Sequence, residues 1–208
     1  MSTLTVLDHA LGRDRLTRMR DASTGREEFV RLTEQLGVVL AVEAGRRLRT
    51  GPCRVCTPME ETTGDRIEKP VCLVPILRAG LGLLKGFQVV YPEAAVGHLG
   101  LKRDEKTLFP EVYLEKTPPD LGGRTVMVLD PMLATGHSAV EALRRLKALG
   151  ATDLLLICCL AAPEGVREVR AAHPDVAILI ATLDRQLDAR GFILPGLGDA
   201  GDRQFGTT

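Results

Sequence analysis

Apolar and polar positions form alternating blocks along the chain that predict strands and helices in turn. Residues 71–76 (VCLVPI) form a continuous apolar run, the pattern of a strand buried on both faces. Further strands are predicted over 125–129, 154–160 and 176–183. Helices are predicted over 26–49, where apolar residues recur at helical spacing, and over 138–149 and 164–172. This alternation implies right-handed crossovers, so we expect an α/β fold with a parallel β-sheet core flanked by helices.

The remaining segments complete this outline. We expect strands over 53–59 and 94–101, a turn at 62–65 (TTGD) and a helix over 83–90. Residues 102–122 are polar, carry prolines and mix both charges, so they are expected to form a flexible flap or β-arm. The tail from Asp184 is expected to be too rich in glycine for a regular element. Because no repeat or linker interrupts the chain, residues 1–208 are expected to form a single domain.

Composition and charge narrow the function classes. The 208 residues are 45% hydrophobic and 26% charged, which is a globular mixture. Lys+Arg and Asp+Glu both number 27, and this zero net charge argues against nucleic acid or a membrane surface as a partner. No apolar run reaches the ~18 residues that span a bilayer. The N-terminal residues lack the order of a signal peptide, so we expect a cytoplasmic protein.

The cysteines carry no predicted site. Their number is five, which is odd and points to free thiols in a reducing compartment. Cys53 and Cys56 match C-x-x-C, but their surroundings look extended, which would point the two side chains to opposite faces. No second pair of ligands follows, so neither a zinc site nor a redox pair is expected there. Cys72, Cys158 and Cys159 lie in apolar runs and are expected in the core.

Residues 130–138 (DPMLATGHS) form the first loop with candidate chemistry. The loop follows a predicted parallel strand, and ligands of such sheets bind beyond the carboxyl ends of the strands. Asp130 at the strand end suits sugar hydroxyls or a metal, and Thr-Gly-His-Ser at a helix start suits a phosphate group. A capping box of Ser138 and Glu141 would explain Ser138 alone, but not the whole loop. His137 is expected to be a bystander that tolerates solvent.

Residues 75–80 (PILRAG) form the second candidate loop. Arg78 follows a strand and precedes small residues, which suits a bidentate clamp on a phosphate group. The alternative is a surface arginine at a turn. Residues 196–201 satisfy G-x-G-x-x-G, but only seven residues follow, too few for the helix and strand of a dinucleotide fold.

Four motifs together resemble a known family. VPILRAGLG, DPMLATGxS, AAPEG and PGLGDAGDRxFGT occur in this order, and the chain is similar to uracil phosphoribosyltransferases over nearly its whole length. The resemblance implies the type I phosphoribosyltransferase fold, a parallel-sheet core with a smaller hood. It also implies the transfer of the phosphoribosyl group of 5-phospho-α-D-ribose 1-diphosphate (PRPP) to uracil. This reaction yields UMP and pyrophosphate for pyrimidine salvage, with Mg²⁺ as cofactor.

The resemblance also assigns the PRPP site. PRPP would be bound by Arg78, Arg103, Asp130, Pro131, Met132, Leu133, Ala134, Thr135, Gly136, His137, Ser138 and Asp199. Asp130 would hold the ribose hydroxyls, and residues 134–138 would cradle the 5′-phosphate. Arg78 and Arg103 would hold the pyrophosphate. Arg103, Asp130 and Asp199 are the expected catalytic residues.

The tail would bind the nucleobase. By resemblance, Ile193, Gly198, Asp199 and Ala200 would meet uracil, largely through backbone atoms. Mg²⁺ would be bound through PRPP and water near Asp199, with no direct protein ligand. No general base is evident in the sequence.

Departures and rival activities qualify this assignment. His137 stands where the family commonly has Gly, Phe192 where it has Tyr, and residues 102–106 (KRDEK) differ from the usual flap sequence. Transfer to orotate or a purine is the rival reaction, and orotate would need a cation from Arg185, Arg190 or Arg203. A PRPP-sensing regulator is the rival from another class. Members associate into homo-oligomers, dimers or tetramers, and GTP activates some of them.

Overall fold

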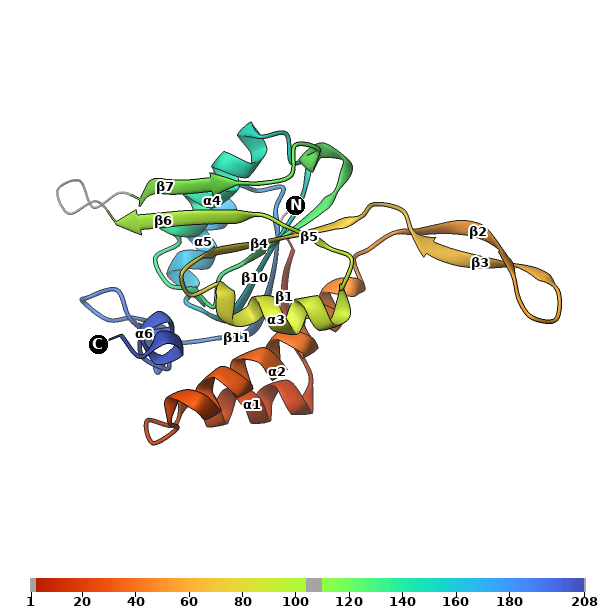
Figure 1. Cartoon of the computed structure of the whole chain (residues 1–208). Helices are drawn as coiled ribbons and strands as arrows, with labels where there is room; N and C mark the ends of the chain where they lie inside the picture. The colour runs from red at the N-terminus through yellow and green to blue at the C-terminus, as the bar shows by residue number, and fades with distance from the viewer. Residues whose placement is uncertain (1–2, 104–109, 208) are drawn as a thin grey trace.

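A sheet of mostly parallel strands forms the centre of the computed structural model, which describes residues 3–103 and 110–207 (Figure 1). The strand order is β1 (Leu4–Val6), β11 (Ala177–Leu183), β10 (Asp153–Ala161), β8 (Thr125–Leu129), β4 (Val71–Leu77), β6 (His98–Arg103) and β7 (Pro110–Lys116). β5 (Ala95–Val96) pairs with β4, and β9 (Met132–Leu133) pairs with β10. All neighbours in this sheet run parallel except β6 and β7. The predicted parallel sheet is confirmed.

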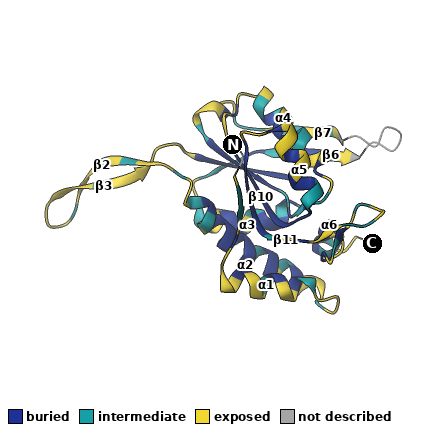
Figure 2. Cartoon of the chain, turned by 180° about the vertical axis from the view of Figure 1, so that it is seen from behind, coloured by how far each residue is buried: buried dark blue, intermediate teal, exposed yellow. Residues whose placement is uncertain are grey.

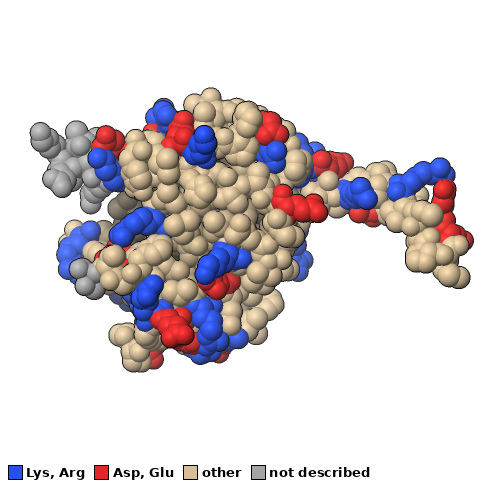
Figure 3. All heavy atoms as spheres, viewed as in Figure 1, with Lys and Arg blue, Asp and Glu red and all other residues tan. Residues whose placement is uncertain are grey.

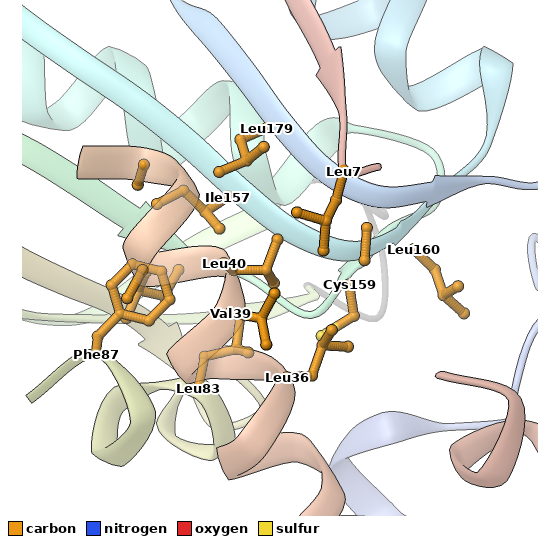
Figure 4. Close-up of a cluster of buried hydrophobic side chains, with 14 of the residues drawn as sticks. Leu7, Leu36, Val39, Leu40, Leu83, Phe87, Ile157, Cys159, Leu160 and Leu179 are labelled. Carbon is orange, nitrogen blue, oxygen red and sulfur yellow. The ribbon is translucent and has the colours of Figure 1, made fainter. Parts of the chain in front are cut away.

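Helices cover both faces of this sheet. α1 (Ala10–Arg20), α2 (Arg26–Gly45) and α3 (Leu81–Val90) belong to one core, and α4 (His137–Ala148) and α5 (Pro163–Ala172) belong to the other. Successive residues of β10 alternate between them, with Leu155 and Ile157 in the first core and Leu156 and Cys158 in the second. Figure 4 shows part of the first core. Because both faces are buried, the central strands read as continuous apolar runs.

The predicted elements of the sheet and its helices agree with the structure to within a few residues. The strand predicted over 94–101 is divided between β5 and β6, and the helix predicted over 26–49 ends at Gly45. The sequence reading missed β1 and α1. The turn predicted at 62–65 is wrong, because these residues belong to β3 (Glu61–Ile67), which pairs with β2 (Thr50–Cys56). Residues 62–65 are polar and mostly exposed, so this part of β3 lacks the alternation of apolar and polar residues that would mark a strand.

The expectation of an irregular tail is also wrong. Residues 184–207 contain a short hairpin, β12 (Gln186–Leu187) with β13 (Ile193–Leu194), and the helix α6 (Ala200–Phe205). Gly191, Gly196 and Gly198 have positive φ and lie between these elements rather than within them. The glycines therefore supply the turns of a compact tail instead of preventing regular structure. α6 packs against α2.

Two hairpins extend from opposite ends of the sheet (Figure 1). β6 and β7 extend from the main sheet at the end where α6 lies, and they place a β-arm in the segment predicted to form one. Residues 104–109, inside the predicted flap, lie outside the described residues. η1 (Leu121–Gly123) follows β7. β2 and β3 form a separate arm at the other end, and Figure 2 shows that this arm is mostly exposed.

The surface of the structure shows no segregation of charge on the face of Figure 3, where acidic and basic groups are interspersed. Within residues 3–103 and 110–207, none of the helices is both long enough and apolar enough to cross a bilayer.

Helices α2 and α3 meet at backbone contact, and this contact positions the segment that follows β4. A Cβ atom at Gly86 of α3 would lie 2.3 Å from the Glu34 carbonyl oxygen and 2.8 Å from the Val38 nitrogen. A Cβ atom at Gly37 of α2 would lie 3.0 Å from the Leu83 carbonyl oxygen. Since no real Cβ approaches backbone so closely, a larger residue at Gly86 would force the two helices apart.

The substitution Gly86→Ala is expected to lower the free energy of unfolding by about 1–3 kcal/mol, because α2 and α3 must separate to admit the methyl group. Gly123→Ala is the matched control, since a Cβ there meets nothing within 4 Å. The control should change the free energy of unfolding by less than about 0.5 kcal/mol. Urea unfolding of the two variants measures the difference, and equal effects would contradict the close crossing of these helices.

Candidate active site

The two candidate loops of the sequence meet in one cleft at the carboxyl ends of β4 and β8. The cleft has a volume of about 230 Å³ and is lined by residues 76–79, Leu101, Asp130, 132–136, 138 and 139. β4 and β8 are adjacent parallel strands, with Pro75 opposite Leu129 in the register. Their carboxyl ends therefore lie side by side, which brings the segments after both strands to the same place.

The loop between β8 and α4 is shaped around Gly136. This residue has φ of +90°, and a Cβ atom there would lie 2.9 Å from Glu168 Cβ and 3.0 Å from the Gly165 carbonyl oxygen. Only glycine fits such a position without strain. α4 begins at His137 with Gly136 as N-cap and with no side-chain cap, so its first amide groups remain available to an anion.

The alternative of a capping box is excluded by the structure. Ser138 lies inside α4 rather than at its N-cap, and Glu141 forms an ion pair with Arg144 at 2.6 Å. Gly136 occupies the N-cap position instead, and it has no side chain to accept hydrogen bonds from the first amides of α4. Ser138 lines the cleft instead, which leaves its hydroxyl for a ligand.

Asp130 is the acidic group of the cleft. It is half-buried, and its backbone amide donates to the Ile157 carbonyl at 3.1 Å. Burial raises the pKa of this carboxyl to about 7, although a hydrogen bond from the Met132 backbone acts in the opposite direction. No ion pair involves Asp130 within the described part of the chain. A ligand that donates hydrogen bonds to this carboxylate would favour its charged form.

Arg78 lies in the cleft and also contacts the tail. Its guanidinium is 3.7 Å from the Asp202 carboxylate, 3.4 Å from the Thr207 hydroxyl and 5.8 Å from the centre of the Phe205 ring. The side chain is 56% exposed, so the ion pair with Asp202 is open to water and contributes little to stability. Arg78 is therefore held near the cleft by weak contacts that a stronger anion can replace.

The tail places Asp199 beside the Arg78 loop. Asp199 is the N-cap of α6, and its carboxylate accepts a hydrogen bond from the Asp202 amide at 2.9 Å. At Gly201, a Cβ atom would lie 3.2 Å from Asp199 Oδ1 and 3.9 Å from Ala79 Cβ. α6 thus packs its first turn directly against the segment after β4.

The other predicted nucleobase residues differ in exposure. Ile193 and Ala200 are buried in the first core, whereas Gly198 is exposed with φ of +81°. Because the Ile193 side chain belongs to the core, only its backbone can face a ligand. This placement agrees with a pocket built largely from backbone groups.

Some predicted residues are not brought into the cleft. Pro131 is buried, and its carbonyl accepts hydrogen bonds from the Cys159 and Leu160 amides at 3.0 Å. His137 is exposed and absent from the cleft lining, as is Asp199. Arg103 ends β6, but its side chain lies outside the described part of the structure.

Sequence reasoning missed several residues at this site. Leu101 and Ala139 line the cleft, and the sequence shows no signal for either beyond its place in an apolar pattern. Arg20 and Arg203 anchor the tail through contacts with residues far away in the chain, which no local pattern could indicate. Phe192, where the family commonly has Tyr, is exposed with the Arg190 guanidinium 5.3 Å from its ring centre.

No group of three or more His, Cys, Asp or Glu side chains gathers into a metal cage within residues 3–103 and 110–207. Cys53 is half-buried and Cys56 exposed on β2, and all five cysteines are free thiols. Any divalent cation at the cleft would therefore need ligands from a substrate or from water.

Comparisons with known proteins agree with this geometry. The sequence model of uracil phosphoribosyltransferase matches residues 6–207. The chain is 50% identical to a uracil phosphoribosyltransferase of Halalkalibacterium halodurans over 208 residues, which is 100% of both chains. The solved structure of a protein from Aquifex aeolicus superposes with a TM-score of 0.93 at 34% identity and covers 99% of both chains.

A more distant structure shares the fold alone. A hypoxanthine-guanine phosphoribosyltransferase of Bacillus anthracis superposes with a TM-score of 0.53 at 11% identity, covering 81% of this chain and 83% of that one. The sheet with its flanking helices is thus that of the type I phosphoribosyltransferases. The match over residues 6–207 and the identity over the full length show that the chain belongs to the uracil phosphoribosyltransferase family.

Proposed function

We propose that the chain transfers the phosphoribosyl group of PRPP to uracil, giving UMP and pyrophosphate for pyrimidine salvage. In this reaction uracil N1 forms a bond to ribose C1, the bond from C1 to the pyrophosphate oxygen breaks, and the N1 proton is released. The observation that carries the proposal is the cleft in which the Arg78 loop, Asp130 and the Gly136 turn meet. The family match supports uracil as the acceptor.

The loop after β8 is proposed to hold the ribose 5-phosphate part of PRPP. Residues 134–138 offer the uncapped start of α4 together with the Thr135 and Ser138 hydroxyls, which suits the 5′-phosphate. Asp130 is proposed to accept hydrogen bonds from the ribose hydroxyls. The loop would be shaped by Pro131, Met132 and Leu133, because the carbonyl of Pro131 accepts hydrogen bonds from amides of β10.

The pyrophosphate is proposed to bind at the Arg78 loop. Displacement at C1 passes through a cation-like sugar, and the leaving pyrophosphate gains negative charge as the bond breaks. A positioned guanidinium stabilises that charge in the transition state. Arg78 meets this need from within the cleft, and Arg103 is proposed to act from the end of β6.

Mg²⁺ is proposed to arrive bound to PRPP and water, near Asp199. The described residues offer single carboxylates at Asp130 and Asp199 rather than a cluster, and this fits a cation that keeps its waters and binds through substrate phosphates. When bound, Mg²⁺ would neutralise charge on the leaving pyrophosphate.

The nucleobase is proposed to bind against the backbone of Ile193, Gly198, Asp199 and Ala200. Orotate is disfavoured, because the Arg203 guanidinium already donates to the Leu197 carbonyl at 2.9 Å and to the Met19 carbonyl. Arg190 lies 3.5 Å from Asp188, and Arg185 is exposed. Arg203, the cation next to the proposed base pocket, is thus not available for a carboxylate on the base.

We also propose a homo-oligomer, a dimer or tetramer, in the cytoplasm. The β2–β3 arm exposes Met59 to 91% and also exposes Val55 and Ile67, and such apolar groups on a projecting arm suit a second copy of the chain. Free thiols at all five cysteines fit a reducing compartment. GTP as an activator is proposed on the family resemblance alone.

The proposed function is tested by incubating the protein with PRPP, Mg²⁺ and a panel of uracil, cytosine, orotate and purines, and measuring pyrophosphate. Release with uracil alone is expected. Release with orotate or a purine would identify a different transferase. No release with any base, together with PRPP binding, would identify a sensor instead of an enzyme.

The raised pKa of Asp130 makes its contribution to stability depend on pH. Between about pH 4 and pH 7 the unfolded chain ionises this carboxyl while the folded chain keeps it protonated, so its contribution becomes unfavourable as the pH rises. Asp130→Asn is therefore expected to raise the free energy of unfolding by on the order of a few kcal/mol at pH 8, and to leave it nearly unchanged at pH 4. Thermal unfolding of both proteins without PRPP at the two pH values measures this.

The same variant is expected to lose activity. Removal of a charge-assisted hydrogen bond to the ribose weakens the transition state by roughly 1.5–3 kcal/mol, which corresponds to a fall in kcat/KM for PRPP of roughly 10- to 100-fold. Wild-type kcat/KM for PRPP in Asp130→Asn would contradict the proposed role of this residue. A lower melting temperature of the variant at pH 8 would contradict the raised pKa.

Base selectivity tests the backbone pocket. Uracil presents an acceptor–donor–acceptor edge, and cytosine reverses two of these groups, so fixed backbone partners would be left unpaired. A preference for uracil of ~10⁴ or more in kcat/KM is expected.

Gly198→Val is expected to raise KM for uracil with PRPP binding largely kept, because Gly198 has φ of +81°. Gly150→Val, with φ of +93° at the end of α4, controls for backbone strain alone. Similar turnover of the two bases, or equal KM in both variants, would place the nucleobase elsewhere.

A further inference from the structure

The turn between β13 and α6, residues 195–198, is held by the ion pair of Arg20 with Asp184. We call these four residues the nucleobase loop. The Gly196 amide donates to Asp184 Oδ2 at 2.9 Å, and the Gly196 carbonyl accepts from the Arg20 guanidinium at 2.7 Å. Arg20 in turn donates to both carboxylate oxygens of Asp184, at 2.8 Å to Oδ2 and 2.5 Å to Oδ1. One bidentate pair thus binds both polar groups of a single residue in the loop.

Both members of this pair are fixed by the main body of the fold. Asp184 directly follows β11, its amide donates to the Ala161 carbonyl at 2.8 Å, and its side chain is only 4% exposed. Arg20 is the last residue of α1. The pair therefore ties the nucleobase loop to the end of β11 and to α1, two elements that the proposed PRPP contacts do not use.

The conformation of Gly196 needs such support. Its φ is +62°, and a Cβ atom there would lie 2.1 Å from the Ile193 carbonyl oxygen. Glycine can adopt many other backbone conformations at little cost in free energy, so without outside contacts Gly196 would not stay in this one. Arg20 and Asp184 select one conformation out of this range.

A second guanidinium holds the next peptide of the loop. Arg203 donates to the Leu197 carbonyl at 2.9 Å and to the Met19, Asp21 and Thr24 carbonyls at the end of α1 and the turn before α2. It also lies 4.3 Å from the centre of the Phe29 ring. The carbonyls of Gly196 and Leu197 thus both accept hydrogen bonds from arginines. These bonds fix the backbone orientation just before Gly198.

We propose that Arg20 and Asp184 are positioning residues for the nucleobase, which set the affinity for uracil through the backbone of the nucleobase loop. The inference rests on the proposed function, in which residues 198–200 meet the base. Both side chains act through Gly196, which they hold by its amide and its carbonyl. A pocket of backbone donors and acceptors selects a ligand only when those groups are held in place, so loosening Gly196 weakens base binding.

The inference separates the two substrates. The groups proposed for PRPP follow β4 and β8, and no hydrogen bond connects the Arg20–Asp184 pair to them within the described residues. Loss of the pair is therefore expected to change KM for uracil and to leave KM for PRPP nearly the same.

Arg20→Ala is the test variant, and Arg18→Ala is the matched control. Arg18 lies on the same helix and forms an ion pair with Glu28, and its guanidinium forms no hydrogen bond or ion pair with the described residues of the tail. Arg20→Ala is expected to raise KM for uracil by ~10-fold or more while KM for PRPP stays within about twofold, and Arg18→Ala should change neither. A lower melting temperature with both KM values unchanged would show that the pair is merely structural and would overturn the inference.

Rescue by free guanidinium sharpens this test. Arg20 lines an open hollow together with residues 195–198 and Arg203, so a small solute can reach its place. Guanidinium chloride at low, non-denaturing concentration should lower KM for uracil in Arg20→Ala, and sodium chloride at equal ionic strength should not.

Should Arg20→Ala fail to fold, Arg20→Lys is used. Lysine keeps the charge but cannot bind the carboxylate and the carbonyl together, so a smaller rise in KM for uracil is expected. An unchanged KM for uracil in folded Arg20→Lys would overturn the inference.

Amide hydrogen exchange of the ligand-free protein separates failure of this inference from failure of the proposed function. Exchange over residues 195–198 should be faster in Arg20→Ala, while exchange in β10 stays the same. If exchange is unchanged, the pair does not hold the loop and the inference fails. If exchange is faster but the wild-type protein makes no UMP from uracil, the proposed function fails, and with it the role in uracil binding.

Discussion

Burial of both faces of the parallel sheet is the constraint on which the rest of this structure depends. Because helices cover each face, the central strands carry apolar residues throughout, and polar chemistry is confined to their ends. The adjacent strands β4 and β8 then place Arg78 and Asp130 at one edge. Two segments that are 52 residues apart in the numbering come together only because their strands pair in this register.

The two halves of the site are stabilised in different ways. The proposed PRPP half consists of loops that directly follow buried strands, so apolar packing and the hydrogen bonds of the sheet fix its geometry. The proposed nucleobase half is a glycine-rich turn, and arginines that donate to its carbonyl groups hold it in place. Removing one partner of such a polar contact leaves the other buried and unsatisfied. The nucleobase half is therefore the more sensitive to loss of a single charged side chain. The PRPP half is the more sensitive to a change in packing, such as a larger residue at Gly86.

The sequence indicates that Arg78 and Asp130 lie near each other, but it carries no signal for the contacts that hold the tail, and the reason is physical. Apolar runs mark buried strands, and the strand-end rule then places Arg78 and Asp130 near each other without any coordinates. The sequence also indicates a phosphate site over residues 130–138, yet its predicted helix begins at Ser138 rather than His137, because no local pattern marks the left-handed Gly136. The pairing of Arg20 with Asp184 spans 164 residues, and neither has a pattern that distinguishes it from other surface charges.

Arg78 and Asp130 are weakly satisfied by protein groups, and this favours a ligand that carries both an anionic group and hydroxyl donors. Asp130 is driven toward its neutral form by burial, and the ion pair of Arg78 with Asp202 is long and exposed to water. On the proposed function, pyrophosphate offers Arg78 a stronger anion than one carboxylate, and ribose hydroxyls give Asp130 the donors that it lacks. Release of Asp202 costs little, since an exposed ion pair contributes little. A ligand that satisfies both groups binds the folded chain and not the unfolded one, so it also stabilises the fold by an amount that rises with the logarithm of its concentration above Kd.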